Sequence, residues 1–330
     1  MTAHAERRTP GGRPLSRCLS RALAYIILLV IPLRVGAQYD PAFNHYWNLQ
    51  TFYNPAASGL DGQINVQGAY AMQMMGYENS PATMIITADL PLWMISPAHC
   101  VGLGFINDKI GLFAHKKFYL HYAYHQKLFG GRLSGGIRFG LISETFNGSG
   151  VDVEDSGDPA FPTSEANGTA FDLDAGLRFD AKNWYAGFSM LHILSPTVHL
   201  GEAKANEYDI PSAFYLTGGY NIRLRNPLFK VQTSAIVRTD LQNWRGDIGA
   251  RVYYYGPKAQ LYAGLGYSPT ISVSGFFGGN FHGVQLGYCY EFYTSGIGAM
   301  QGVHEISIGY VTDLSLFKKN KNRHQSVRIL

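Results

Sequence analysis

The chain has 330 residues, of which 15% are charged, well below the roughly 25% of a typical soluble domain. That composition excludes an ordinary water-exposed surface on every side, and no apolar run after the first 37 residues approaches the roughly 20 residues of a membrane-spanning helix. The formal net charge is only +4, and much of it comes from the two chain ends, so no basic face suits nucleic acid.

Residues 1–37 have the layout of a secretory signal peptide. Basic residues precede the apolar stretch Ala22 to Leu33, and small residues before Gln38 place the cleavage after Ala37. An anchoring helix is the alternative, but the stretch is short and contains Pro32. The basic residues are Arg7, Arg8, Arg13, Arg17 and Arg21. Export of the chain is therefore predicted.

Residues 38–62 are predicted to form a periplasmic lead-in that could plug or cap a lumen. From about Gln63 to residue 312, segments of eight to thirteen residues alternate between apolar and polar positions, which is typical of β-strands. In the segment 169–180, one face is apolar and contains Phe171 and Leu173, whereas the other contains Asp172 and Asp174. Such a split suits lipid outside and a polar lumen inside.

The whole region 63–312 is predicted to be an all-β outer-membrane barrel of about fourteen antiparallel strands. The lengths suit tilted strands that cross a bilayer. The predicted strands are 63–74, 83–90, 99–107, 116–128, 132–146, 169–180, 184–191, 213–222, 228–239, 245–254, 259–268, 271–279, 282–293 and 303–312.

The connections favour a membrane barrel over a soluble sandwich. Tight turns such as Gly130-Gly131 alternate with longer connections, two of which, 147–168 and 192–212, have about twenty residues. Outer-membrane barrels place short turns in the periplasm and long loops outside. Both chain ends are therefore predicted to be periplasmic, including the basic tail 313–330, which could dock a partner. Its basic residues are Lys318, Lys319, Lys321, Arg323 and Arg328.

No group of residues predicts an enzyme, a cofactor site or a metal site. His121 and His125 are four apart, and on a strand this spacing spans about 13 Å, too far for one metal ion. The acids between Asp152 and Asp158 lack the ligand spacing of a known calcium loop. Cys100 and Cys289 are interpreted as packing residues, with a disulfide as the alternative. The polar residues predicted to face the lumen are Asp172, Asp174, Arg178 and Arg251.

Three short motifs are more informative than the alternation. They are Asn54-Pro55-Ala56-Ala57-Ser58-Gly59, Asn107-Asp108-Lys109-Ile110-Gly111 and His304-Glu305-Ile306. With the tyrosine-rich segment 116–128, their order from about Gln38 to Val311 resembles the PorP/SprF family of type IX secretion system membrane proteins. Asn54-Pro55 favours a turn, and Asn107-Asp108-Lys109 can hold a loop through side-chain hydrogen bonds.

The resemblance implies an integral outer-membrane protein of a Bacteroidota bacterium, without catalytic residues. Its implied partners are the type IX ring lipoproteins and other periplasmic components, and secreted proteins with C-terminal sorting domains, such as gliding adhesins. Lipid and lipopolysaccharide would surround the barrel. The alternative function is a channel or transporter for a small molecule, with the lumen residues setting its selectivity. A barrel that only tethers the envelope is a third hypothesis.

Overall fold

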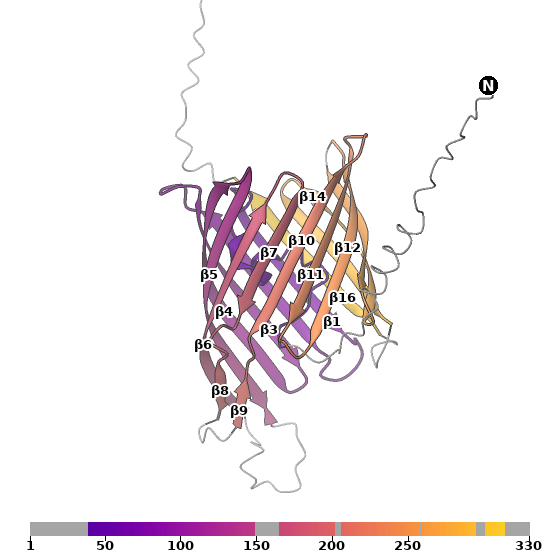
Figure 1. Cartoon of the computed structure of the whole chain (residues 1–330). Helices are drawn as coiled ribbons and strands as arrows, with labels where there is room; N and C mark the ends of the chain where they lie inside the picture. The colour runs from indigo at the N-terminus through magenta and orange to yellow at the C-terminus, as the bar shows by residue number, and fades with distance from the viewer. Residues whose placement is uncertain (1–38, 149–164, 202–205, 258, 295–300, 314–330) are drawn as a thin grey trace, which may run out of the picture. The chain divides into compact units, whose positions relative to one another are not determined.

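The protein is described by a computed structural model that covers residues 39–148, 165–201, 206–257, 259–294 and 301–313. Fourteen antiparallel strands form a closed barrel in which β1 pairs with both β2 and β16 (Figure 1). The strands are β1 Ile64–Gln73, β2 Ala82–Pro91, β3 His99–Ile110, β4 Phe113–Leu128, β5 Gly131–Asn147, β6 Glu165–Asp180, β7 Trp184–Leu191, β10 Ala213–Arg223, β11 Phe229–Thr239, β12 Trp244–Tyr255, β13 Gln260–Ser268, β14 Ser272–Phe281, β15 Val284–Tyr293 and β16 Val303–Thr312.

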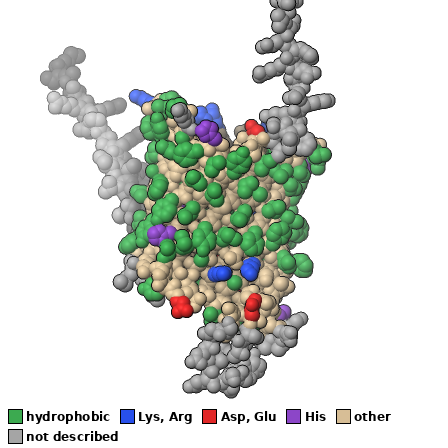
Figure 2. Space-filling model, turned by 180° about the vertical axis from the view of Figure 1, so that it is seen from behind, with side chains coloured by type: hydrophobic (Ala, Val, Ile, Leu, Met, Phe, Trp, Pro, Cys, Tyr) green, Lys and Arg blue, Asp and Glu red, His purple; other side chains and the backbone are tan. Residues whose placement is uncertain are grey.

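The wall separates an apolar outside from a polar inside. On β4, Phe118, Leu120 and Tyr122 are exposed on the outer face, whereas Tyr119 and His121 between them are buried. Figure 2 shows that hydrophobic side chains cover the wall on the face it presents, with most charged side chains toward its two ends. An outer face of this kind suits lipid, as the alternation in the sequence predicted.

The predicted strands all correspond to strands of the barrel, and the largest difference is at β6, predicted from 169 and beginning at Glu165. One strand end was wrong. The strand predicted for 99–107 continues to Ile110, so residues 107–109, which were interpreted as able to hold a loop, pair with Met84, Thr83 and Ala82 of β2. The turn follows at Gly111, whose φ of 61° suits glycine.

The long connection 192–212 contains a small hairpin that the sequence analysis did not predict. Its strands are β8 Thr197–Leu200 and β9 Asn206–Asp209. Together they extend the barrel wall at the bottom of Figure 1. Most of the other long connection, 149–164, lies outside the described residues, as do the predicted signal peptide 1–37 and the tail residues 314–330.

Residues 39–62 lie inside the barrel. They include a short helix, α2 (Gln50–Tyr53), and the 3-10 turn η1 (Pro55–Ala57). Three side chains of β5 give the direction of this inner segment, because Glu144 binds Tyr39, Arg138 binds Phe52 and Arg132 binds Leu60. The inner segment therefore runs from the long-loop end of the barrel to the short-turn end, where β1 begins.

The described residues begin and end at opposite ends of the barrel, at Tyr39 and Asp313. The periplasmic location of both chain ends stays a prediction, because residues 1–38 and 314–330 lie outside the described residues. Asp313 follows β16 beside the β14–β15 turn, where the Val311 amide donates to the Gly283 carbonyl. The inner segment spans the lumen before β1 begins, so the two described ends cannot share a rim.

No helix among the described residues is long and apolar enough to cross a membrane. Cys100 and Cys289 are buried and free, each on an inner wall position. They pack as the sequence analysis expected, and the alternative disulfide is not formed.

Candidate functional site

The inner segment is held by wall side chains from around the whole barrel. Near its middle, Arg138 of β5 donates hydrogen bonds to the backbone carbonyls of Thr51 and Phe52, the latter at 2.9 Å. Two strands further along the wall, Ser189 Oγ of β7 donates to the Tyr53 carbonyl at 2.5 Å. Wall groups thus satisfy the carbonyls of a helix too short to satisfy them itself.

Asn54 connects α2 to η1 and to the wall. Its side-chain oxygen accepts from the Ala56 amide at 2.9 Å, and its amide donates to the Leu177 and Phe188 carbonyls at 3.0 and 3.3 Å. Pro55 then begins η1, a position where its missing N–H is not needed. The backbone here approaches the wall so closely that a Cβ on Gly136 would lie 2.3 Å from the Ala56 nitrogen.

The opposite side of the barrel holds the segment through two carboxylates. Glu305 of β16 accepts from the backbone amides of Asn44 and His45 at 2.6 and 2.9 Å, and its Oε1 lies 2.6 Å from His45 Nδ1. The Asn44 side chain donates to Glu291 of β15 at 2.9 Å. Arg251 of β12 lies over the Trp47 ring at 3.9 Å, a favourable cation–π contact.

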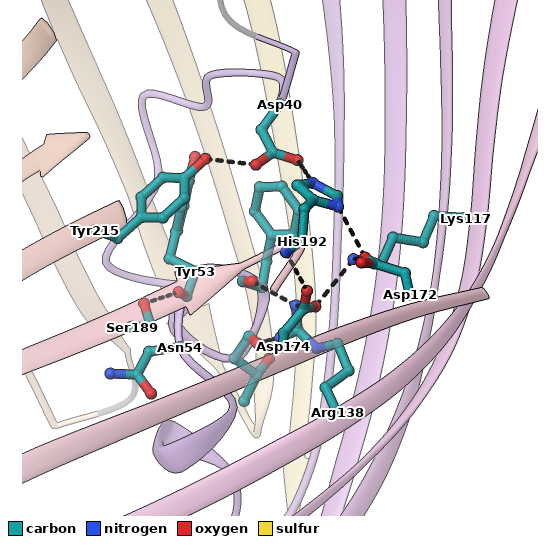
Figure 3. A network of polar contacts seen from close by, with 12 residues as sticks. Asp40, Tyr53, Asn54, Lys117, Arg138, Asp172, Asp174, Ser189, His192 and Tyr215 are labelled. Atoms are coloured by element: carbon teal, nitrogen blue, oxygen red, sulfur yellow. Dashed lines mark hydrogen bonds and ion pairs between the residues drawn. The ribbon is translucent and has the colours of Figure 1, made fainter. Parts of the chain in front are cut away.

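A charged network fixes the beginning of the segment (Figure 3). Asp40 accepts a hydrogen bond from Tyr215 at 2.8 Å, and its other oxygen lies 3.1 Å from His192 Nε2. His192 Nδ1 in turn lies 2.8 Å from Asp172. The His192 ring therefore bridges a carboxylate of the inner segment and a carboxylate of the wall.

The same network continues along the wall to α2. Lys117 Nζ lies 2.5 Å from Asp172 and 2.9 Å from Asp174, and Arg138 lies 3.1 Å from Asp174. With Asp40 and a protonated His192, three carboxylates face three cations. Such balance is what buried charges require.

These contacts determine the pKa values of His192 and Asp40, the two network residues that lie outside the strands. Burial disfavours the charged form of His192, but the Asp40 carboxylate and the hydrogen bonds to Asp172 and Asp40 outweigh it and raise the His192 pKa to about 9. Burial alone would raise the pKa of Asp40, yet the charge of His192 holds it below its ordinary value. The two groups therefore form an ion pair at neutral pH.

Asp172, Asp174 and His192 also have the residue types and proximity of a metal site, since their ligand atoms lie within 4.8 Å of one another. Lys117 already lies between the two carboxylates at ion-pair distance. A cation would have to displace this ammonium group, so we interpret the cluster as an ion-pair network.

The end of the segment is held at the short-turn rim. The Gly59 amide donates to Asp89 of β2 at 2.6 Å, and Arg132 of β5 donates to the Leu60 carbonyl at 2.7 Å. His125 Nε2 lies 2.8 Å from the Ser58 carbonyl, while His121 Nε2 lies 3.2 Å from the Ser58 hydroxyl. The two histidines bind adjacent groups of one residue in the inner segment.

A family model described as "Type IX secretion system membrane protein PorP/SprF" matches residues 35–310, which is most of the chain. The chain belongs to the PorP/SprF family. Together with the closed barrel, this membership makes it an outer-membrane component of the type IX secretion system. No curated protein matches the chain.

Solved structures similar to this PorP/SprF protein are bacterial membrane barrels with little sequence identity. A FadL homologue from Pseudomonas aeruginosa has a TM-score of 0.47 at 12% identity, with 84% of this chain and 96% of that chain covered. The toluene transporter TbuX from Ralstonia pickettii has a TM-score of 0.48 at 11% identity, with 84% and 95% covered. At this similarity, their substrates say nothing about this protein.

The predicted lumen residues of this PorP/SprF protein all lie buried on the inner wall. Asp172 and Asp174 belong to the charged network. Arg178 binds Asp180 with two nitrogens and donates to the Gln50 side chain at 2.7 Å, and Arg251 contacts Trp47. Each of the two arginines thus touches the inner segment.

The three family motifs lie in different environments. Residues 54–59 are part of the inner segment, and Glu305 binds it, whereas His304 lies on the outer face and contacts the Tyr288 hydroxyl at 2.8 Å. Asp108 accepts from Thr83 on the inner wall at 2.5 Å. Lys109 is exposed near the long-loop rim. The motifs of the PorP/SprF family therefore do not form one site.

Several residues of the charged network were not predicted as site residues: Asp40, Lys117, Arg138 and His192. The alternation placed Lys117 and Arg138 on polar faces of their strands. It could not show that they would pair with Asp172 and Asp174, or that the inner segment would bring Asp40 beside His192. The sequence signal that could have indicated Lys117 and Arg138 as network residues is a basic residue in the middle of a predicted inward face.

Proposed function

We propose that this protein is a non-enzymatic anchor of the type IX system rather than its pore. In this role it supports secretion or surface attachment of proteins with C-terminal sorting domains through contact with the periplasmic ring. The filled lumen carries this proposal. Within the described part of the barrel, the cavity between the inner segment and the wall near Arg132 and Asp180 has a volume of about 240 Å³.

The proposed orientation has the short turns in the periplasm and the long loops at the cell surface. Signal cleavage after Ala37 is part of the same proposal. Sequencing of the mature protein from its N-terminus should begin at Gln38, and a tag inserted after Gly201 in the β8–β9 connection should be accessible on intact cells. If the tag is accessible only after the outer membrane is permeabilised, the protein has the opposite orientation, with the long loops in the periplasm.

We further propose that the ring contacts the short-turn rim. Three large apolar residues at the tips of adjacent turns are strongly exposed there: Met94 at 84%, Ile95 at 71% and Phe129 at 88%. The neighbouring groove, which includes Lys127 and Lys182, adds positive charge. Exposed apolar residues surrounded by polar ones are typical of protein interaction sites.

The test is affinity purification of a tagged copy from detergent-solubilised outer membranes, followed by mass spectrometry. Ring lipoproteins or a protein with a C-terminal sorting domain should co-purify. A variant with Met94→Ser, Ile95→Ser and Phe129→Asn should lose the ring components. Leu241→Asn is the matched control, because Leu241 is 70% exposed in a turn at the other rim and, like Phe129, has a positive φ.

If the wild-type barrel purifies without any of these partners, the anchor proposal fails. The channel hypothesis then becomes the better one. It would require residues 39–62 to leave the lumen, and conductance of the purified barrel would be the next measurement.

A further inference from the structure

The outer face of β3 to β6 changes abruptly from apolar to polar near the long-loop rim. One row of outward residues across the four strands consists of Phe105, Phe118, Leu141 and Phe171, which are paired in register. Phe118, Leu141 and Phe171 are exposed. Aromatic rows of this kind occur where an outer-membrane barrel meets the membrane interface. The apolar belt therefore ends at this row.

The next two rows toward the rim are polar. The first consists of Asn107, Lys116, Ser143 and Thr169, and the second of Lys109, Ala114, Thr145 and Asn167. Lys109 and Lys116 are exposed, and adjacent strands and a two-residue offset separate their Cα atoms by about 8 Å. We call these two rows the polar step.

Neither lysine has an ion-pair partner among the described residues, although ion pairs are frequent on the inner wall. The outward acid of these strands, Glu165, lies one row further from the belt than Asn167. Two ammonium groups without an ion-pair partner in the described part of the chain thus lie at the depth of lipid headgroups, where basic side chains attract anionic lipids.

We propose that the polar step binds the phosphate groups of an outer-leaflet glycolipid. Lys109 and Lys116 would pair with phosphate, and the amides and hydroxyls of Asn107, Ser143 and Thr169 would bind sugar hydroxyls. The step spans four strands, about 14 Å between the outer two, which suits a phosphorylated disaccharide better than a single phosphodiester headgroup. The assignment to the outer leaflet rests on the proposed orientation, with the long loops at the cell surface.

The test uses the purified full chain in detergent and native mass spectrometry with lipid A as the added probe. Lys109→Gln with Lys116→Gln should reduce the fraction of barrel that retains lipid A by roughly tenfold or more. The control is Lys127→Gln with Lys182→Gln, which removes two exposed charges from the other rim and should retain lipid A as the wild type does. Lys109→Arg with Lys116→Arg should also retain it.

Equal loss in both glutamine pairs, or in neither, would overturn the proposal. Phosphatidylglycerol distinguishes a glycolipid site from a site for any anionic headgroup. If it competes with lipid A at equal concentration, the polar step binds any anionic headgroup and the glycolipid assignment is wrong. Because purified components are used, the result does not depend on whether the barrel contacts the secretion ring.

Discussion

At Gly136 the wall lies directly against the backbone of the inner segment. A Cβ there would lie 2.3 Å from the Ala56 nitrogen and 2.4 Å from the Pro55 carbonyl carbon, both backbone atoms that cannot move alone. We expect Gly136→Ala to lower the free energy of unfolding by about 1–3 kcal/mol, the usual cost of overpacking.

Gly135→Ala is the matched control, because a Cβ on Gly135 meets only Leu177 Cδ2, at an ordinary 3.7 Å. The measurement is the temperature at which the barrel loses its compact migration in denaturing gels. Equal shifts for the two variants would mean that the strand, rather than the inner segment, senses the substitution.

His192 predicts how stability varies with pH. Its pKa is raised to about 9 in the fold, against about 6.5 in an unfolded chain. Its contribution is therefore complete below about pH 6.5 and is lost as the pH rises through 9. The shift corresponds to roughly 3 kcal/mol.

Thermal unfolding at pH 6.5 and pH 9.5 checks this prediction. The wild-type barrel should lose stability between these values, and His192→Gln should be less stable at pH 6.5 and lose much less on the change to pH 9.5. An unchanged slope in the variant would assign the pH dependence to other groups.

For single residues, the sequence predicted which side of the wall a side chain faces better than it predicted which residues that side chain contacts. The period-two alternation predicted that Asp172 and Arg251 point into the barrel, because the side to which a side chain points depends only on its own strand. The partners of these residues depend on the path of residues 39–62, which have no periodicity and whose contacts come from seven or more strands around the wall. Asp40 and His192, separated by 152 positions, could not be paired from the sequence.

At the level of elements, the inner segment determines whether the barrel is open. Deleting residues 39–62, while keeping the signal peptide, should give a barrel that conducts ions in planar bilayers, whereas the full chain should conduct far less. A fourteen-strand barrel is wide enough for a lumen once the segment is removed. Equal conductance would show that the segment does not occlude the lumen in a membrane.

The deletion also exposes buried charges, so its folding needs a separate check. Heat-modifiable migration in gels reports whether the barrel forms. Glu305→Gln is a milder variant. It weakens one attachment of the inner segment to the wall, because Glu305 accepts hydrogen bonds from two backbone amides of that segment. We expect this variant to show brief openings rather than a steady conductance.

Strands were easier to predict than the segments between them. Each strand has ten or so alternating residues with one face in lipid, and this pattern is visible in a single sequence. The β8–β9 hairpin has only four residues in each strand, too few for alternation to stand out. Asp108 and Lys109 were missed as strand residues because their polar side chains resemble those of a loop, although they lie at the polar edge of the belt.

For the whole molecule, the anchor proposal predicts that the lumen stays filled during secretion. Thr51 of α2 and Thr87 of β2 have hydroxyl oxygens 3.1 Å apart, so cysteines at both positions are close enough for a disulfide after a small adjustment. Secretion of proteins with C-terminal sorting domains should be unchanged in Thr51→Cys with Thr87→Cys under oxidising conditions.

The single variant Thr51→Cys is the control, and gel mobility before and after reduction measures how much of the bond has formed. If secretion stops in the double variant and returns on reduction, the inner segment must move for export. That result would favour a role as the pore of the type IX system over the anchor proposal.

The inner segment also constrains the order in which the molecule can be assembled. Residues 39–62 precede every strand, yet they end up enclosed by all of them, so a barrel that closed first would have to admit 24 residues through its own wall or mouth. The last strand, β16, seals the ring against β1 and supplies Glu305, which binds Asn44 and His45. The final seam is therefore also a contact with the enclosed chain, and we expect the sheet to close around a peptide that is already in place.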